Sequence, residues 1–289
     1  MAKSMTSKQF QAGFPTDDAC LNHLFKIRYG HEIICPKCGQ IDTFHKLSKM
    51  PAFTCNCGHH IHPMAGTPFQ STRTSLTTWF QVMFLFTSSR NGVSAKEVQR
   101  LTGVTYKTAW RMCNEIRKYM GWVDGDAPIG GSGPKAKVVE MDKAFIGGKD
   151  KQGFDDKAVV LGMIERGGDV MTRVIPGRNW HSVNRAMLHN VKEGSTIYTD
   201  EAPVFKSLPA LGFEHEAVNH SKKEWVRGNV HTNSIEAFWS NVKRSISGTH
   251  VWVSKKHLQT YLSEFEYRYN LRKEPELMMD ALLRSFPRA

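Results

Sequence analysis

The 289-residue sequence is longer than the roughly 100–200 residues typical of one domain, so two or three domains are expected. Lys and Arg number 39 against 27 Asp and Glu; this net charge of +12 indicates a polyanionic partner without distinguishing nucleic acid from an anionic membrane. No run of about 18 apolar residues occurs and the first residues lack an apolar signal stretch, which argues against a membrane span or export and predicts an intracellular protein.

The N-terminal part combines a short helical pattern over residues 15–28 with a cysteine-rich stretch over residues 31–69. Two short cysteine pairs separated by a loop can surround a tetrahedral ion with soft thiolate ligands. The pattern therefore predicts one structural Zn²⁺, with reduced core cysteines as the alternative. The second pair is one residue shorter than usual, which leaves His59, His60 or His62 open as a substitute ligand. The four expected ligands are Cys35, Cys38, Cys55 and Cys57, whereas Cys20 and Cys113 stand alone.

From Ser75 to about Met120 the apolar residues recur at helical spacing. A capping box at Ser94–Glu97 begins one helix, Gly103 supplies a turn, and Thr105 can cap a second helix that continues through Ile116. We expect a helix-turn-helix, with an ordinary helical hairpin and a solvated basic face as the alternative. The second helix is expected to bury Ala109, Met112, Cys113 and Ile116 and to present Tyr106, Lys107, Arg111 and Asn114 to DNA.

Residues 121–134 contain so many glycines and prolines that a domain boundary is expected there. Beyond it, strands are predicted at Val138–Ile146, Ala158–Glu165, Val170–Ile175 and Thr196–Thr199, with a weak strand near Glu216–Val218. Helices are predicted near Ser182–Val191, at Pro203–Leu208, and at 233–246 and 254–271. The order βββαβαβα predicts an α/β fold with a ribonuclease-H-like mixed sheet flanked by helices.

These patterns divide the chain into four expected regions. Residues 1–72 hold the N-terminal helix and zinc ribbon, and residues 73–121 hold the helix-turn-helix region. Residues 122–136 form a linker, and residues 137–289 form the ribonuclease-H-like domain.

Three acidic residues fall where this order of elements would bring them together. Asp142 lies in the first strand, Asp200 closes the fourth, and Glu236 lies near the start of a late helix. Phosphodiester cleavage can use two Mg²⁺ ions, or Mn²⁺, about 3.5–4 Å apart and held by carboxylate oxygens. Taken singly, Asp200 could cap a helix and Glu236 could complete a capping box beginning at Asn233. Their joint occurrence favours a metal-binding catalytic triad.

The sequence resembles the zinc-ribbon-headed group of bacterial insertion-sequence DDE transposases over most of its length. The matching segments are Leu24, Cys35–Gly39, Cys57-Gly58, Ala65–Phe69, Tyr106–Met112, Val139–Asp142, Ile146–Lys149, Tyr198–Asp200, the run His231–Ser240, Lys243-Arg244, Gly248-Thr249 and Val253–Leu258. The resemblance implies Asp142, Asp200 and Glu236 as the metal-binding triad. It implies Lys243, seven residues after Glu236 on the same helical face, as a DNA-contacting lysine, with Arg244 beside it.

The implied activity is cleavage at the terminal inverted repeats of a mobile element followed by joining of the 3′ hydroxyl to target DNA. Double-stranded DNA is the expected partner, the protein is expected to be cytoplasmic and nucleoid-associated, and a homo-oligomer is expected on DNA ends. Lys143 stands where the family carries an acidic residue, which points to a degenerate copy as one possibility. A DNA-binding regulator without catalysis and a structure-selective nuclease of the same fold are the alternatives.

Overall fold

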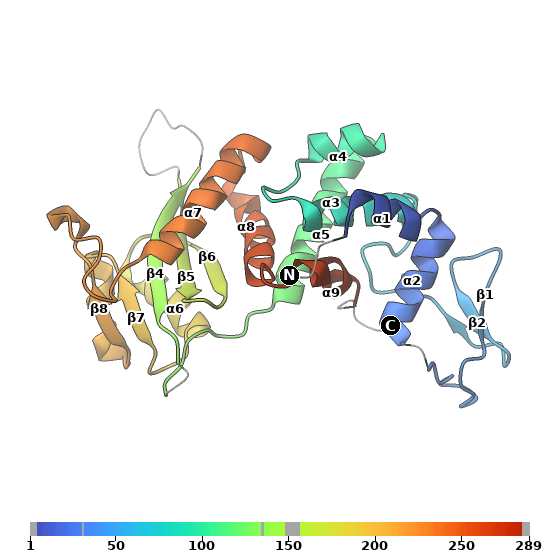
Figure 1. The fold of residues 1–289 in the computed structure, drawn as a ribbon, viewed down its shortest axis with the longest axis horizontal. Helices are drawn as coiled ribbons and strands as arrows, with labels where there is room; N and C mark the ends of the chain where they lie inside the picture. Colours follow the sequence, from blue (N-terminus) through green and yellow to red (C-terminus); the bar gives the residue numbers. More distant parts are fainter. Residues whose placement is uncertain (1–4, 31, 134–135, 148–156, 285–289) are drawn as a thin grey trace. The chain divides into compact units, whose positions relative to one another are not determined.

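The computed structural model describes residues 5–30, 32–133, 136–147 and 157–284 (Figure 1). Gly148 and Lys149 of the resembling segments lie outside the described residues. The chain divides into two compact units, residues 1–119 with 271–289, and residues 120–270. None of the helices within the described ranges is both long and apolar enough to cross a membrane.

The first unit consists mainly of helices, with one small antiparallel sheet of order β1-β2-β3. Its elements are α1 (Ser7–Gly13), α2 (Asp17–Tyr29), β1 (Phe44–Lys46), β2 (Phe53–Cys55), β3 (His60–Ile61), α3 (Leu76–Ser88), α4 (Ala95–Thr102), α5 (Tyr106–Asp124), η6 (Pro275–Leu277) and α9 (Met278–Arg284). The seven-residue helices α1 and α9 were not expected, because such short segments carry too few periods for a sequence pattern. α9 packs on α2 and α3, so the second unit ends at residue 270, whereas the expected domain ran to residue 289.

The core of the first unit is aromatic, and it joins the helices to the segment that follows the small sheet. Trp79, Phe80 and Phe69 are fully buried, and the Phe69 and Trp79 rings meet edge to face with centroids 5.3 Å apart. Arg28 of α2 is buried and donates to the carbonyls of Pro63 and Ala65. These bonds attach α2 to the chain immediately after β3.

The helix pair α4 and α5 forms around the predicted turn. Gly103 adopts the left-handed conformation that ends α4, and the Thr105 hydroxyl accepts the Thr108 N–H at 3.3 Å. The Ser94 hydroxyl accepts the Glu97 N–H at 3.1 Å, but the Glu97 carboxylate pairs with Arg100 at 2.6 Å. Half of the expected capping box therefore forms. The four residues predicted to face inward on α5 are all buried.

Helix α5 does not end at the expected boundary; it continues through Gly121 to Asp124. A Cβ at Gly121 would lie 2.7 Å from the Ser263 hydroxyl, so this glycine permits a close approach to the helix α8 (Lys255–Asn270). The Asn270 amide donates to both oxygens of Asp124, at 3.0 and 2.9 Å. A glycine inside a helix here reflects packing, whereas the sequence pattern favoured a break.

The second unit contains a five-stranded mixed sheet of order β6-β5-β4-β7-β8. β4 (Val139–Ile146), β5 (Ala158–Glu165) and β6 (Val170–Ile175) are antiparallel, whereas β7 (Thr196–Thr199) and β8 (Glu214–Ala217) run parallel to β4. Within the described part of this unit, the helices are α6 (Trp180–Asn190), α7 (Asn233–Ser245), α8, the π-helical turn η5 (Ile246–His250) and the 3₁₀ turns η2 (Pro203–Phe205), η3 (Pro209–Leu211) and η4 (His220–Lys222). This is the predicted ribonuclease-H-like arrangement. The expected helix Pro203–Leu208 is instead the turn η2, and Pro209, which has no N–H to donate, prevents its continuation.

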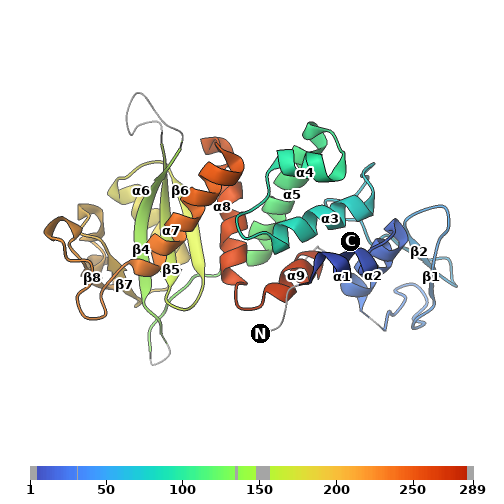
Figure 2. The same cartoon turned by 45° about the horizontal axis from the view of Figure 1, so that its top comes forward.

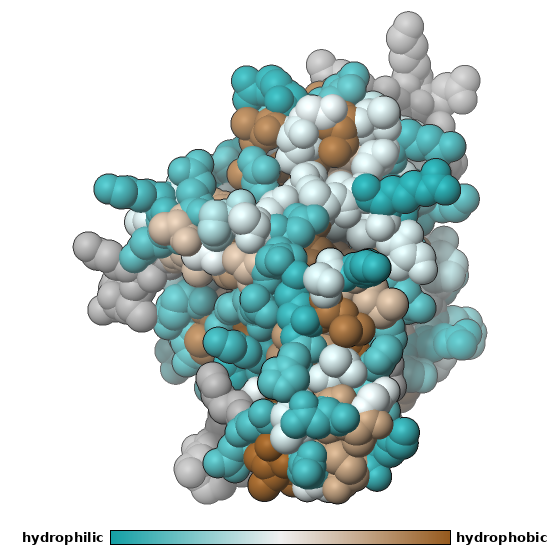
Figure 3. All heavy atoms as spheres, turned by 90° about the vertical axis from the view of Figure 1, so that its right-hand side faces the viewer, coloured by the Kyte–Doolittle hydropathy of each residue, from teal (hydrophilic) through white to brown (hydrophobic). Residues whose placement is uncertain are grey.

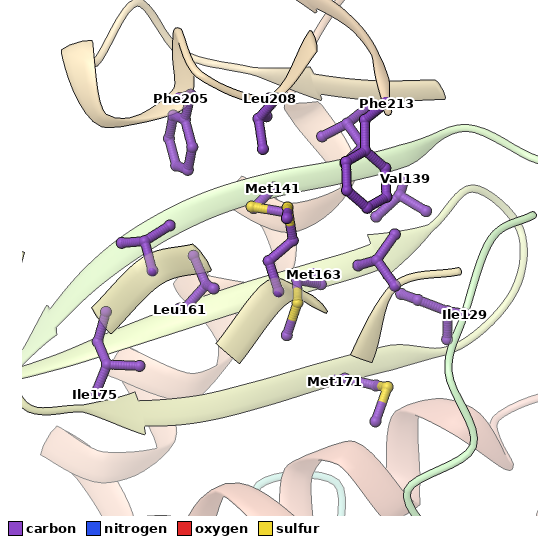
Figure 4. Close-up of a cluster of buried hydrophobic side chains, with 14 residues drawn as sticks. Ile129, Val139, Met141, Leu161, Met163, Met171, Ile175, Phe205, Leu208 and Phe213 are labelled. Atoms are coloured by element: carbon purple, nitrogen blue, oxygen red, sulfur yellow. The ribbon is translucent and has the colours of Figure 1, made fainter. Parts of the chain in front are cut away.

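Helix α6 covers one face of this sheet, and α7 and α8 cover the other (Figures 1 and 2). On the α6 face, Val139, Met141 and Leu161 pack with Phe205 and Leu208, as Figure 4 shows. On the opposite face, Ala144, Val160 and Ile164 pack against Ile235 and Trp239 of α7 and Leu262 of α8. The alternation of side chains along β4 therefore decides which of its polar residues face α7.

The outer edge of the sheet is closed by side chains of α8. The N–H groups of Val170, Thr172 and Val174, on alternate positions of β6, donate to Asn270, Glu266 and Gln259 at 2.8, 2.9 and 2.8 Å. Because an uncovered edge strand invites pairing with another chain, these bonds protect the sheet and fix α8 along it.

Candidate functional site

The four predicted cysteines converge in the first unit. Cys35 Sγ lies 3.6 Å from Cys57 Sγ, and Cys38 Sγ lies 3.6 Å from Cys55 Sγ. All four sulfurs lie within 4.8 Å of one another. Zn–S bonds of about 2.3 Å in a tetrahedron require sulfurs about 3.8 Å apart, so the thiolates fit a structural zinc ion. The Thr43 hydroxyl lies 2.9 Å from Cys55 Sγ and provides an outer hydrogen bond to that ligand.

The shortened second cysteine pair left open whether a histidine replaces one cysteine as a zinc ligand, and this geometry answers the question. Among the residues that the structure describes, the metal-binding group contains the four cysteines and none of His59, His60 and His62. A tight turn brings Cys57 beside Cys55: the Gly58 N–H donates to the Cys55 carbonyl at 2.8 Å, and Gly58 adopts a positive φ of 81°. The face of the molecule on the side of the zinc ribbon is mostly hydrophilic, with isolated hydrophobic residues (Figure 3).

On the helix pair, the predicted DNA-facing residues differ in exposure. Tyr106, Lys107 and Arg111 are exposed on α5, whereas Asn114 is half-buried with its amide 3.4 Å from Glu115. Lys96 of α4 lies 4.8 Å from the centre of the Tyr106 ring. The exposed basic residues near the start of α5 can meet phosphate, while Asn114 is less accessible.

In the second unit, strand pairing aligns the first two carboxylates. Val139 lies opposite Ile197 and Glu140 opposite Tyr198, so the same register continued by two residues brings Asp142 level with Asp200. Neighbouring strands lie about 4.8 Å apart, and side chains alternate between faces. Both carboxylates therefore project from the face that α7 covers.

Glu236 lies on α7, above that face, with its side chain 49% exposed. The N-cap of α7 is Thr232, so Glu236 is the fourth helical residue, and the alternative interpretation of Asn233–Glu236 as a capping box does not hold. The Thr232 hydroxyl instead donates to Glu236 Oε1 at 2.6 Å, and His220 Nε2 lies 3.8 Å from the same oxygen. The role of Glu236 as a helix cap is thereby removed.

The carboxylates influence one another electrostatically. Burial, reinforced by the negative charges of Asp200 and Glu236, raises the pKa of Asp142 to about 6. A divalent cation among these groups would relieve the repulsion, and carboxylate oxygens are the donors that Mg²⁺ prefers. Among the described residues, the four cysteine sulfurs form a group close enough to hold one metal ion, and the three carboxylates do not.

Lys143, the departure from the family pattern, belongs to the other face of β4. It alternates with Asp142, and its ammonium lies 4.8 Å from the centre of the Phe205 ring in the α6-side core. Burial lowers the pKa of Lys143, against the opposing effect of Asp200 and Asp142. Lys143 therefore projects from the face of β4 opposite to Asp142, while its charge still interacts with Asp200 and Asp142.

A buried carboxylate that the sequence analysis missed joins β4 to α7. Glu140 is fully buried, and its carboxylate accepts the N–H groups of Ser234 and Ile235 at 2.7 and 3.1 Å. The Arg166 Nε donates to it at 2.7 Å, and His231 Nδ1 lies 3.3 Å away. Glu140 thus caps the N-terminus of α7. It joins β4, the strand of Asp142, to α7, the helix of Glu236. The available sequence signal was a second acidic residue in the strand, two positions before Asp142 and therefore on the same face.

A glycine that the sequence analysis also missed sets how closely α7 approaches the sheet. Gly162 of β5 lies directly opposite Asp142. A Cβ there would lie 2.3 Å from the Trp239 ring and 2.8 Å from Ile235, both on α7. A glycine inside a strand often marks such a close approach.

Lys243 and Arg244 are exposed in the last turn of α7. Lys243 follows Glu236 by seven residues, which places it on the same side of the helix about 10 Å further along.

Both parts of the chain are similar to known protein families. Residues 132–270 match the ISXO2-like transposase domain, and residues 15–60 match the transposase zinc-ribbon domain. An uncharacterized protein in transposable element ISH50 of Halobacterium salinarum is 25% identical over 287 residues, covering 91% of this chain and 94% of that protein. An uncharacterized transposase-like protein of Haemophilus influenzae is 30% identical over 101 residues, which are 35% of this chain and 80% of that protein.

Proposed function

The chain belongs to the family of insertion-sequence transposases with an N-terminal zinc ribbon, and from this premise we propose that it cleaves DNA at the ends of a mobile element and joins them to target DNA. Water attacks the terminal phosphodiester, which releases a 3′ hydroxyl and leaves a 5′ phosphate. The 3′ hydroxyl then attacks a target phosphodiester in line and displaces a target 3′ oxygen. No covalent protein intermediate is required.

The residues proposed to hold two Mg²⁺ ions are Asp142, Asp200 and Glu236. The ions, or Mn²⁺ in their place, would activate the attacking oxygen and stabilise the leaving oxygen. The chain's own contribution is to fix the carboxylates: Asp142 and Asp200 through the β4–β7 register, and Glu236 through the capping of α7 by Glu140. Lys243 and Arg244 are proposed to hold the adjoining DNA backbone.

The observation that carries this proposal is the placement of two carboxylates level with each other on neighbouring strands, beneath a helix that bears the third. The raised pKa of Asp142, due to burial and then to Asp200 and Glu236, supports their proximity. A fold-level likeness alone would not assign chemistry.

End binding is proposed for the first unit. Lys107 and Arg111 on α5 would contact DNA as part of a helix-turn-helix, with Asn114 contributing less because it is half-buried. The proposed functional regions are 1–72, 73–121, 122–136 and 137–289, although α9 at the end of the last region packs in the first unit. A homo-oligomer is proposed on the paired ends. Association with the nucleoid would follow from DNA binding.

Incubation of the protein with its own flanking terminal repeats, target DNA and Mg²⁺ tests the proposal through cut and joined products. Asp142→Asn, Asp200→Asn and Glu236→Gln should each nearly abolish cleavage and leave end binding within a few-fold of the wild type. Because Glu236 caps nothing, Gln at this position should preserve stability, which separates a chemical loss from a folding loss. A Glu236→Gln protein that cuts and joins would refute the triad.

The same assay distinguishes the alternatives. A DNA-binding regulator binds the ends and cuts nothing, and a structure-selective nuclease cuts without joining. Turnover that persists in excess chelator would refute metal-assisted chemistry.

A further inference from the structure

An exposed tryptophan lies next to the proposed triad, on the loop Asn219–Val230 that follows β8. Trp225 is 57% exposed. Its ring centroid lies 4.9 Å from that of His220, whose Nε2 lies 3.8 Å from Glu236 Oε1. The His220 side chain therefore lies between the indole of Trp225, a large planar apolar surface, and the Glu236 carboxylate, which is proposed to hold metal.

Hydrogen bonds hold this loop in one conformation. Glu201, the residue after Asp200, accepts the N–H groups of His220 and Ser221 at 3.0 and 3.1 Å. Glu224 accepts the Asn219 N–H at 3.2 Å. Because the loop is anchored beside Asp200 before any ligand arrives, little ordering entropy remains to oppose binding through Trp225.

The surroundings of Trp225 suit a nucleic acid strand. Lys222 and Lys223 are exposed, and no ion pair to either occurs among the described residues. A cleft of about 620 Å³ beside the loop is lined by side chains of both charges: the acidic Asp200, Glu201 and Glu224, and the basic Lys206, Lys222 and Arg227. Trp225 follows Glu224 on the same loop, outside the lining of the cleft. The basic side chains can meet phosphates, and the exposed indole beside them can meet a base.

We propose that Trp225 stacks on an unpaired DNA base next to the scissile phosphate. This inference rests on the proposed function for its location and adds a base-binding site to it. Aromatic stacking accepts any base, since each base has a π face, and contributes to binding without reading the sequence. Drawing a base out of the duplex costs unpairing and unstacking energy, and an aromatic ring that stacks on the displaced base offsets part of that cost.

Binding measured in Ca²⁺ tests the proposal without requiring cleavage. The probes are a terminal-repeat duplex and the same duplex with unpaired bases at the cleavage position. The wild type should bind the unpaired probe more tightly than the duplex. Trp225→Ala should lower the affinity for the unpaired probe roughly 5- to 100-fold and change the affinity for the duplex little. Trp225→Phe should retain most of the preference. Trp180→Ala is the matched control, because Trp180 is 44% exposed at the start of α6, on the opposite face of the sheet.

Three outcomes would overturn the inference. Trp225→Ala could bind the unpaired probe as tightly as the wild type, or lose equally on both probes. It could also alter the oligomeric state without altering the probe preference, which would make Trp225 a protein contact. Parallel cleavage assays in Mg²⁺ keep the two proposals apart. A Trp225-dependent preference without cleavage refutes the proposed function alone, and cleavage without that preference refutes the stacking site alone.

Discussion

At the scale of single residues, the position of α7 depends on a glycine, which has no side chain to keep the helix away from the sheet. Gly162 faces Asp142 across β4 and β5, and the space where its Cβ would lie is filled by Trp239 and Ile235. Any larger residue must push α7, and therefore Glu236, away from the strand that bears Asp142. The glycine thus couples the packing of the core to the geometry of the proposed triad.

We expect Gly162→Ala to lower the free energy of unfolding by about 1–3 kcal/mol through overpacking. Cleavage should fall by more than the loss of folded protein explains. Denaturant unfolding and the terminal-repeat assay measure the two effects. Gly248→Ala is the control, because nothing lies within 4 Å of the added Cβ. Equal behaviour of the two variants would contradict the packing role of Gly162.

Glu140 provides the second residue-scale prediction. We expect Glu140→Gln to lower the free energy of unfolding by about 3–5 kcal/mol, because it leaves Arg166 without its buried carboxylate and weakens the cap of α7. The control Glu216→Gln removes an exposed pair with Arg227, at 3.4 Å, and should cost under about 1 kcal/mol. Denaturant unfolding that gave the same loss for both would show that Glu140 has no special structural role.

At the scale of elements, α8 closes the sheet edge with a group that titrates. Glu266 is buried and accepts the Thr172 N–H, and burial raises its pKa to about 7 from an ordinary 4.5. A carboxyl group whose pKa is raised on folding stabilises the fold fully below pH 4.5, and that contribution is lost as the pH rises through 7. The attachment of α8 to β6 should therefore weaken toward alkaline pH.

We expect Glu266→Gln to flatten the pH dependence of the free energy of unfolding between about pH 4.5 and 8. The difference in this window should reach up to about 3 kcal/mol, since each unit of raised pKa corresponds to about 1.4 kcal/mol. Unfolding measured at several pH values gives the two curves. Parallel curves for variant and wild type would exclude Glu266 as the source of the pH dependence.

The zinc ribbon is the second element whose stability can be tested directly. Its three strands have two or three residues each, so the metal must supply most of the folding energy, roughly 10–16 kcal/mol apparent for structural zinc. We expect one zinc per chain and its loss in Cys38→Ser, with unfolding of the ribbon. Cys113→Ser should keep the zinc, because Cys113 lies buried on α5 outside the quartet. Metal analysis that found no zinc in the reduced, folded wild type would refute the site.

At the scale of the whole molecule, DNA binding is proposed for the first unit and the cleavage and joining reactions for the second. The net charge of +12 implies that DNA affinity falls steeply with salt. We expect Lys107→Ala combined with Arg111→Ala to weaken end binding and to reduce the salt slope by about one for each phosphate that is no longer neutralised. Lys118→Ala is the control, because Lys118 already pairs with Glu115 at 2.9 Å. Binding titrations at several salt concentrations that showed unchanged affinity and slope would exclude α5 as the recognition helix.

Local patterns in the sequence were sufficient for most elements and for the zinc site. Alternation along β4 to β6 and helical spacing along α7 and α8 arise between near neighbours in the chain, so they are visible without the fold. The cysteine quartet combines two short pairs with ligands of one chemical type. The triad remains a proposal. Its residues could be selected from the sequence because Asp142 lies within a predictable strand, Asp200 follows another, and Glu236 lies in the first turns of a predictable helix.

Other features depended on residues far apart in the chain, which no short period records. Glu140 caps α7 across 94 positions, and Gly162 makes room for Trp239 across two elements. α9 packs with α2 and α3 in the first unit, although it follows the second unit in sequence. The proximity of Trp225 to Glu236, through His220, was equally invisible. Each depends on distances set when the sheet pairs and the helices pack, so only the tertiary structure decided it.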